Sequence, residues 1–223
     1  MTDQVSPTPT DENFSAHRMG AFADAVLAIA ITLLVIEIKR PEGEALASPH
    51  ALAEFLWHEK ASFVAFALAF FLLWSVWRRH HILIDEVDRL DRATTAAHAP
   101  LLLFAAFLPF PTAIFGHASD NKLAACLFAA TAAALFGSEA VMKEFAWRRA
   151  ILRPGVDPLQ IRVSANASAS VTFVFALTAA LVWITPWIWY IWFFVPLAAA
   201  FGGKLLERVR PDAGGRRAEH SQV

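Results

Sequence analysis

Residues 18–38 read RMGAFADAVLAIAITLLVIEI, an apolar run interrupted by Asp24 and by Glu37 near its end. A helix needs about 20 mostly apolar residues to cross the hydrocarbon core of a bilayer. The run has that length, and Lys39, Arg40 and Pro41 mark its end. We therefore predict a transmembrane helix over residues 18–38.

Further windows of the same kind follow along the chain, and none has the alternating pattern of a strand. The predicted spans are residues 18–38, 61–84, 99–116, 123–142, 165–185 and 187–206. We expect Pro109 and Pro111 to bend or break the third span. The fold class expected is an all-α integral membrane protein with six transmembrane helices.

Composition supports a membrane class. Hydrophobic residues make up 57% of the chain and charged residues 17%, with a mean hydropathy of +0.47. A soluble domain carries about a quarter of charged residues. The single cysteine, Cys126, excludes an internal disulfide. Four tryptophans flank Pro186 and are predicted to form an interfacial belt: Trp183, Trp187, Trp189 and Trp192.

The segments outside the spans are polar. Residues 1–17 lack the basic-then-apolar order of a secretory signal, and residues 208–223 have no apolar period. We expect both to be disordered cytoplasmic tails around a membrane domain of residues 18–207. A water-exposed helix through Leu52 to Trp57 is expected before the second span.

Lys and Arg are divided unevenly between the two sides that six spans define. One side receives fifteen, including Lys143 directly after the fourth span, and the other receives only Lys39, Arg40, Lys60 and Lys122. Cytoplasmic loops carry the excess of Lys and Arg in membrane proteins. We therefore expect a multi-pass protein of the inner (plasma) membrane with both termini in the cytoplasm.

The first predicted helix has two different faces, because each residue turns a helix by about 100 degrees. Asp24 shares one face with Ala28, Ile31 and Val35. The other face carries Arg18, Phe22, Ala25, Ile29, Thr32, Leu33 and Ile36.

Two interpretations of the face with Ile29, Thr32 and Ile36 stay open. If several copies of the helix converged on one axis, the branched side chains would form a constriction that gates by excluding water. Alternatively, these residues pack against other helices or lipid, and Thr32 bonds to a carbonyl one turn back.

Asp24 needs a partner, because an ionisable residue inside a span costs about 2.5 to 3.5 kcal/mol on insertion scales. On the second helix, Trp77, His81 and Asp85 share a face at four-residue spacing, and indole or imidazole N–H groups could donate to Asp24. A metal site at His81 and Asp85 is the alternative, but the adjacent His80 diverges by about 100 degrees. We favour an anchoring role for Asp24 and predict no metal site.

Together these segments resemble the transmembrane protein 175 family of potassium channels in its bacterial single-repeat form. The family signature on the first helix is Arg, three residues, then Phe-Ser-Asp, and it stands here as Arg18, Phe22, Ala23 and Asp24. Ala23 departs from the signature serine and removes one hydroxyl. The second helix agrees at WRRHH, residues 77–81, and the third at LPFPTA, residues 108–113.

The resemblance implies a homotetrameric cation channel in which four first helices line the pore. The family lacks the Gly-Tyr-Gly filter of other potassium channels, and that tripeptide is absent from this sequence. By position, Ile29 would match the main hydrophobic constriction. Thr32 would match a hydroxyl that aids selection of potassium, and Leu33 and Ile36 further apolar layers. The residues implied to hold the pore helix in place are Arg18, Phe22, Asp24, Trp77 and His81.

An ion that passes an apolar ring must shed or squeeze its water shell, and weakly hydrated potassium does so at lower cost than sodium. We therefore expect moderate selectivity. The sequence has no nucleotide-binding glycine loop, no arginine-rich voltage-sensing helix and no calcium loop. We predict no catalytic residues, no cofactor and no nucleic-acid partner; the expected partners are potassium ions, the bilayer and further copies of the chain.

Other classes of protein remain as alternatives. A small secondary transporter should have internal repeats and a broken helix at mid-membrane, and only the Pro109 and Pro111 break supports it. An intramembrane hydrolase using His80 or His81 would lack a Gly-x-Ser-x-Gly elbow and a His-Glu-x-x-His motif. A non-conducting scaffold is separated from a channel by conductance.

Overall fold

The computed structural model describes residues 16–88, 90, 92–149 and 151–194. Its elements are helical apart from one isolated bridge. In chain order they are α1 (Ala16–Ile36), η1 (Gly43–Leu46), α2 (Pro49–His58), α3 (Lys60–Glu86), α4 (Arg92–Phe107), α5 (Pro109–His117), α6 (Lys122–Arg148), α7 (Pro158–Leu181) and η2 (Pro186–Phe193). In this part of the chain five helical stretches are long and apolar enough to cross a membrane, with α4 and α5 counted together.

Each of the first five predicted spans coincides with one of these stretches, but the bounds differ. α1 ends at Ile36 and α7 at Leu181, before the predicted residues 38 and 185, whereas other ends extend further. α6 continues to Arg148 and α7 begins at Pro158. The Asp157 side chain accepts the Leu159 N–H and caps α7, so polar turns that hydropathy excludes are still helical. Hydropathy therefore located the spans and not their ends.

The sixth predicted span lies partly beyond the described residues. Residues 195–206 are outside them, and so are the predicted tail residues 1–15 and 208–223. The part that is described, Pro186–Phe193, forms the 3-10 helix η2, where an α-helix was predicted. The described chain thus establishes five candidate spans.

The predicted break in the third span is present at Leu108. α4 ends at Phe107 and α5 begins at Pro109, because proline has no N–H to donate and clashes with the preceding turn. The Leu108 carbonyl accepts both the N–H and the hydroxyl of Thr112, at 3.2 and 2.7 Å. The Leu108 carbonyl thus takes part in the first turn of α5.

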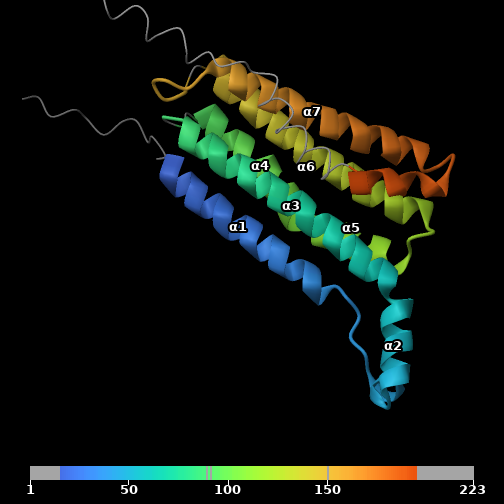
Figure 1. Ribbon diagram of the computed structural model, residues 1–223. Helices are drawn as coiled ribbons and strands as arrows, with labels where there is room; N and C mark the ends of the chain where they lie inside the picture. Colours follow the sequence, from blue (N-terminus) through green and yellow to red (C-terminus); the bar gives the residue numbers. More distant parts are fainter. Residues whose placement is uncertain (1–15, 89, 91, 150, 195–223) are drawn as a thin grey trace, which may run out of the picture.

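The helices form a bundle with α1 at one edge and α7 at the opposite edge (Figure 1). α1 packs on α3 and α4, α4 packs on α6, and α6 packs along α7. α2 lies steeply to the bundle at one end (Figure 1) and buries none of its residues, as expected for the exposed helix before the second span. Its first turn is capped by Ser48, which accepts from the Ala51 N–H at 3.1 Å.

Successive spans run in opposite directions, and one buried cluster shows this. The cluster joins the start of α1, the end of α3, the start of α4, the end of α6 and the start of α7, through Ala16, Leu83, Ala97, Ala146 and Ile161. The same end carries most of the described arginines, whereas Lys39, Arg40, Lys60 and Lys122 lie at the other end.

The interfacial belt predicted around Pro186 is wrong for Trp192. This side chain is fully buried against Phe115, Phe128 and Phe175, and its indole N–H donates to the Thr178 hydroxyl at 2.9 Å. Trp183 is exposed, as a belt residue would be. After α7 the chain turns back against the bundle (Figure 1), and this places Trp192 in the core.

Candidate functional site

α1 has one face in the core and one face outside it. The core face is made of small and leucine side chains at alternating three- and four-residue spacing: Gly20, Ala23, Leu27, Ala30 and Leu34. These residues are buried against α3, α4 and α5. A stripe with this spacing is the geometry of a helix packed along its neighbours.

Small residues on the core face let α1 approach α3 closely. At Gly20 an added Cβ would lie 3.0 Å from the Ile84 side chain. Ala23, which replaces the signature serine, is fully buried among apolar residues. A hydroxyl at this position would therefore face the packed core of the bundle.

The opposite face of α1 is apolar and largely exposed in the described part of the chain. Ile29 is 59% exposed, Phe22 and Ile36 are each 58% exposed, and Leu33 is 39% exposed. These are residues that helical phase placed together, but Val35, which it placed on the face of Asp24, is 55% exposed as well. The face is therefore available to lipid or to another chain.

The only hydroxyl on this face is that of Thr32, and its proton is already used. Thr32 Oγ1 donates to the Ile29 carbonyl at 2.8 Å, which is the bond to the preceding turn that the sequence allowed. The oxygen lone pairs stay available as acceptors.

Asp24 is half-buried and receives a hydrogen bond from α3. The Trp77 indole Nε1–H donates to Asp24 Oδ1 at 3.0 Å. The Trp77 ring stacks on His81 with centroids 5.8 Å apart, and His81 Nε2 lies 3.9 Å from Asp85 Oδ2. The structure thus brings Asp24, Trp77 and His81 together, while Phe22 lies on the exposed face of α1.

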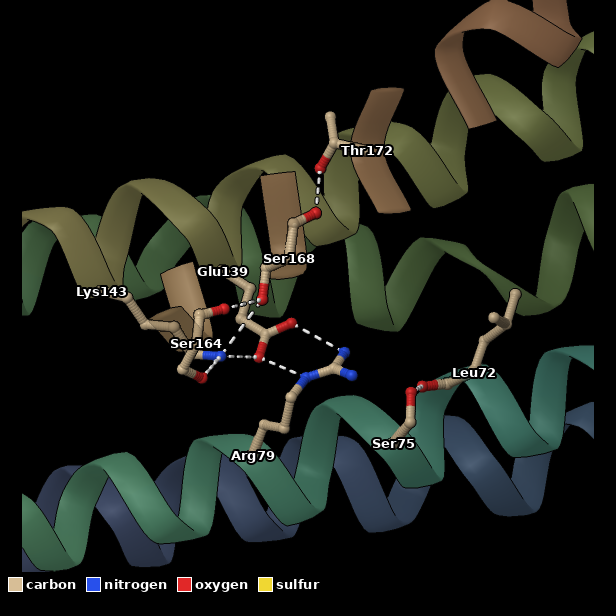
Figure 2. Close-up of polar contacts among 8 residues, drawn as sticks. All are labelled: Leu72, Ser75, Arg79, Glu139, Lys143, Ser164, Ser168 and Thr172. Carbon is tan, nitrogen blue, oxygen red and sulfur yellow. Dashed lines mark hydrogen bonds and ion pairs between the residues drawn. The ribbon is translucent and has the colours of Figure 1, made fainter. Parts of the chain in front are cut away.

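A second polar cluster, which was not predicted, joins α3, α6 and α7 inside the bundle (Figure 2). Glu139 on α6 is fully buried and accepts two hydrogen bonds from the Arg79 guanidinium, at 2.8 and 2.9 Å. Lys143 is also buried and donates to Glu139 Oε1 at 2.7 Å. One carboxylate therefore binds two cations.

Two serines of α7 complete the cluster. Lys143 Nζ donates to Ser164 Oγ at 2.9 Å and to Ser168 Oγ at 3.2 Å (Figure 2). A buried ammonium needs several acceptors, and these hydroxyls supply them beside the carboxylate. We refer to Arg79, Glu139, Lys143, Ser164 and Ser168 as the charge cluster.

The sequence did contain a signal for this cluster. Glu139 lies within the predicted span 123–142, where an acidic residue calls for a buried partner. Lys143 follows four residues later, on the same face of a helix. The predicted span ended at residue 142, so Lys143 was counted with the loop cations, and the pair was overlooked.

Two buried histidines, His80 on α3 and His98 on α4, are in contact with each other. The rings of His80 and His98 meet edge to face with centroids 5.3 Å apart, and His98 Nδ1 lies 2.8 Å from the Thr94 carbonyl oxygen. Both ring nitrogens of His80 have no hydrogen-bond partner among the described residues. In that part of the chain no three His, Cys, Asp or Glu side chains are grouped closely enough to hold a metal ion.

The apolar spans and the buried charges define the class as a multi-pass helical membrane protein. The model of the family described as "Endosomal/lysosomal potassium channel TMEM175" matches residues 18–109. A protein of Streptomyces collinus named a potassium channel is 32% identical over 162 residues, which are 72% of this chain and 75% of that protein. The chain belongs to the TMEM175 family.

Further relatives agree with this assignment. A protein of Chamaesiphon minutus named a potassium channel is 37% identical over 105 residues, 46% of this chain and 50% of that protein. The crystal structure of a lysosomal potassium-selective channel TMEM175 homologue from Chamaesiphon minutus superposes with a TM-score of 0.70 at 26% identity. That match covers 86% of this chain and 97% of the other. The potassium channel MtTMEM175 shares the fold, with a TM-score of 0.53 at 18% identity, over 92% of this chain and 100% of the other.

Proposed function

We propose that this chain is a potassium channel in which four copies assemble so that their α1 helices line one pore. Membership of a family whose similar members are named potassium channels supports the ion. The exposed apolar face of α1 carries the proposal about the pore. A helix that packs one face in the core and leaves Ile29, Leu33 and Ile36 exposed is suited to meet its copies about an axis.

In this arrangement Ile29 forms the main constriction. Four isoleucine side chains around an axis make an apolar ring, which excludes water when narrow and conducts when it widens or wets. Leu33 and Ile36 add further apolar layers. The ring offers no strong ligand, so discrimination depends on the cost of removing water from the ion.

Thr32 contributes an oxygen one turn from the constriction. Its hydroxyl proton is directed to the Ile29 carbonyl, so the oxygen presents lone pairs to a passing cation. A cation that has lost part of its water shell at Ile29 is compensated best by such an acceptor. The selectivity for potassium over sodium that this supports is moderate.

Asp24 has a supporting task in the proposed channel. The bond from Trp77 ties α1 to α3 and fixes the rotation of α1 about its own axis, so Ile29 faces away from the core. Arg18, Phe22 and His81 are proposed to belong to the same supporting set. Asp24 therefore acts as an anchor and does not bind the permeating ion.

The proposed orientation places the arginine-rich end of the bundle in the cytoplasm. With a sixth span over residues 187–206, both termini lie on that side of the inner (plasma) membrane. A reporter fused to the C-terminus tests this, since a periplasmic signal would contradict it.

Potassium and sodium flux in proteoliposomes that contain the purified protein tests the function. We expect potassium-preferring flux, and we expect Ile29→Asn to increase it by wetting the constriction. A folded tetramer without flux of either ion would favour a non-conducting scaffold. If Ile29→Asn leaves the flux unchanged, the assignment of the constriction to Ile29 is contradicted.

A further inference from the structure

A line of polar contacts crosses the bundle from its outer edge to α1. Ser164 and Ser168 on α7 bind Lys143 of α6, and Lys143 and Arg79 share the Glu139 carboxylate. Arg79 lies on α3, two residues after Trp77, which donates to Asp24 on α1. The contacts between helices join α7 to α6, α6 to α3 and α3 to α1, so the line reaches α1 from α7.

α3 is the element where the line passes from one side of the bundle to the other. Two residues turn an α-helix by roughly 200 degrees, so Trp77 and Arg79 point in opposite directions. One holds Asp24 of α1 and the other holds Glu139 of α6. Within one turn, α3 is therefore hydrogen-bonded to α1 on one side and to α6 on the other.

The charge cluster is hard to rearrange. Arg79 reaches Glu139 by two parallel bonds, a geometry that fixes both distance and rotation. Movement of α3 away from this position would leave a buried carboxylate or a buried cation without its partner, which is strongly unfavourable. The cluster thus allows one rotation of α3 and opposes others.

A second connection holds the end of α3 to the segment after α6. The Asp88 N–H donates to the Ile151 carbonyl and the Arg153 N–H donates to the Glu86 carbonyl, each at 2.9 Å. These bonds fix the end of α3 along its length, but they lie beyond the turn that carries Trp77. The two bonds from Arg79 to Glu139 lie within the turn that carries Trp77.

We infer that Arg79, Glu139 and Lys143 are positioning residues for the pore, which set the rotation of α3 and, through Trp77 and Asp24, the direction of the Ile29 face of α1. This inference rests on the proposed function. It assigns to α6 and α7, which lie away from α1, a part in the conducting geometry. Altering the cluster should therefore change conduction in a protein that still assembles.

The test compares Arg79→Lys with Arg78→Lys. The first keeps the charge and loses the paired bonds to Glu139, whereas Arg78 is exposed and is the adjacent arginine on α3. We expect Arg79→Lys to lower the potassium-to-sodium permeability ratio several-fold, measured as the reversal potential, in tetramers verified by size. Equal ratios for the two variants would overturn the inference.

A double-mutant comparison separates positioning from general stability. Trp77→Phe removes the donor to Asp24, and if Arg79 acts through the same helix rotation, combining the two changes should shift the ratio by less than the sum of the single effects. Shifts that add fully would mean that Arg79 acts independently of Trp77, and would overturn the inference.

If Arg79→Lys yields no tetramer, Ser164→Ala with Ser168→Ala provides the decisive variant. It removes two acceptors of Lys143 and keeps every charge, and its control is Ser170→Ala, whose hydroxyl donates only to the Asn166 carbonyl. We expect a lower permeability ratio for the pair and an unchanged one for the control. An unchanged ratio for the pair would overturn the inference.

Failure of the inference and failure of the proposed function give different results. A wild-type protein without flux would contradict the channel itself. If the wild-type protein conducts, and Ile29→Asn changes the flux but changes in the charge cluster do not, the channel function stands and only the positioning role is contradicted.

Discussion

A soluble protein places apolar side chains inside and charged side chains outside, whereas the exposed face of α1 and the charge cluster show the opposite arrangement. On α1, Ile29 and Ile36 are more than half exposed, whereas Glu139 and Lys143 are almost completely buried inside the bundle. In a bilayer, apolar surface is tolerated outside and charge is tolerated only where partners satisfy it. The contrast teaches that the bundle satisfies its charges inside, within a largely apolar core, while the apolar face of α1 is left for contacts outside the bundle.

The largest effect should come from Glu139→Gln. The change leaves the buried Lys143 and the partly buried Arg79 without a carboxylate, and breaking a buried pair costs about 3–5 kcal/mol. We expect a large fall in the thermal unfolding midpoint in detergent. Glu144→Gln is the control, because the pair of Glu144 with Arg148 is exposed and such pairs contribute about 0–1 kcal/mol. Equal effects of the two changes would contradict the structural role of the charge cluster.

The next effect separates the two faces of α1. Leu27→Ala opens a cavity in the core, at a cost near the lower end of the roughly 2–5 kcal/mol known for this change, because the unfolded reference is also apolar in a membrane. Ile29→Ala should leave the stability of the subunit almost unchanged. Unfolding of both variants in detergent measures the difference. A larger loss for Ile29→Ala would mean that its face is packed within the subunit.

Trp77→Phe should have a smaller effect on stability. It leaves the ring in place and removes the donor to Asp24, and an unpaired polar group that is partly buried costs about 1–3 kcal/mol. We expect a modest fall in unfolding midpoint, and Trp74→Phe serves as the control on the exposed side of α3. If both variants unfold alike, the bond to Asp24 does not stabilise the subunit.

The smallest effect on stability should come from Thr32→Ala, which removes only an exposed hydroxyl bonded to its own helix. Thr32→Ala should instead reduce the selectivity for potassium over sodium, so the reversal potential should move toward the value of a non-selective pore. An unchanged reversal potential would leave Thr32 without a part in selection.

The sequence predicted that Ile29, Leu33 and Ile36 share one face of α1, because the angular position of a residue on a helix depends only on its number. It also predicted a bond from Trp77 to Asp24, because Trp77 carries an indole N–H on the face of the second helix that it shares with His81. It did not reach the charge cluster, since the span was closed one residue before Lys143 and a single sequence does not say which helices are neighbours. The buried position of Trp192 was missed for the same reason.

The boundaries of α6 and α7 show a further limit. Helices continue through polar turns such as those at Arg148 and Pro158, because caps and hydrogen bonds decide helix ends, while hydropathy reports only the apolar stretch. The all-α membrane class was therefore predictable from the sequence. The polar contacts between helices could be identified only from the three-dimensional structure.

The central claim is that the exposed face of α1 lines the pore. Its most direct test places single cysteines on α1 in a Cys126→Ala background and measures whether a thiol reagent blocks the potassium current. If the exposed face lines the pore, reagent added from the aqueous side should block Ile29→Cys and Ile36→Cys and leave Leu27→Cys and Leu34→Cys unaffected. Unchanged current after modification of Ile29→Cys and Ile36→Cys would contradict the claim and place the conduction path elsewhere in the protein.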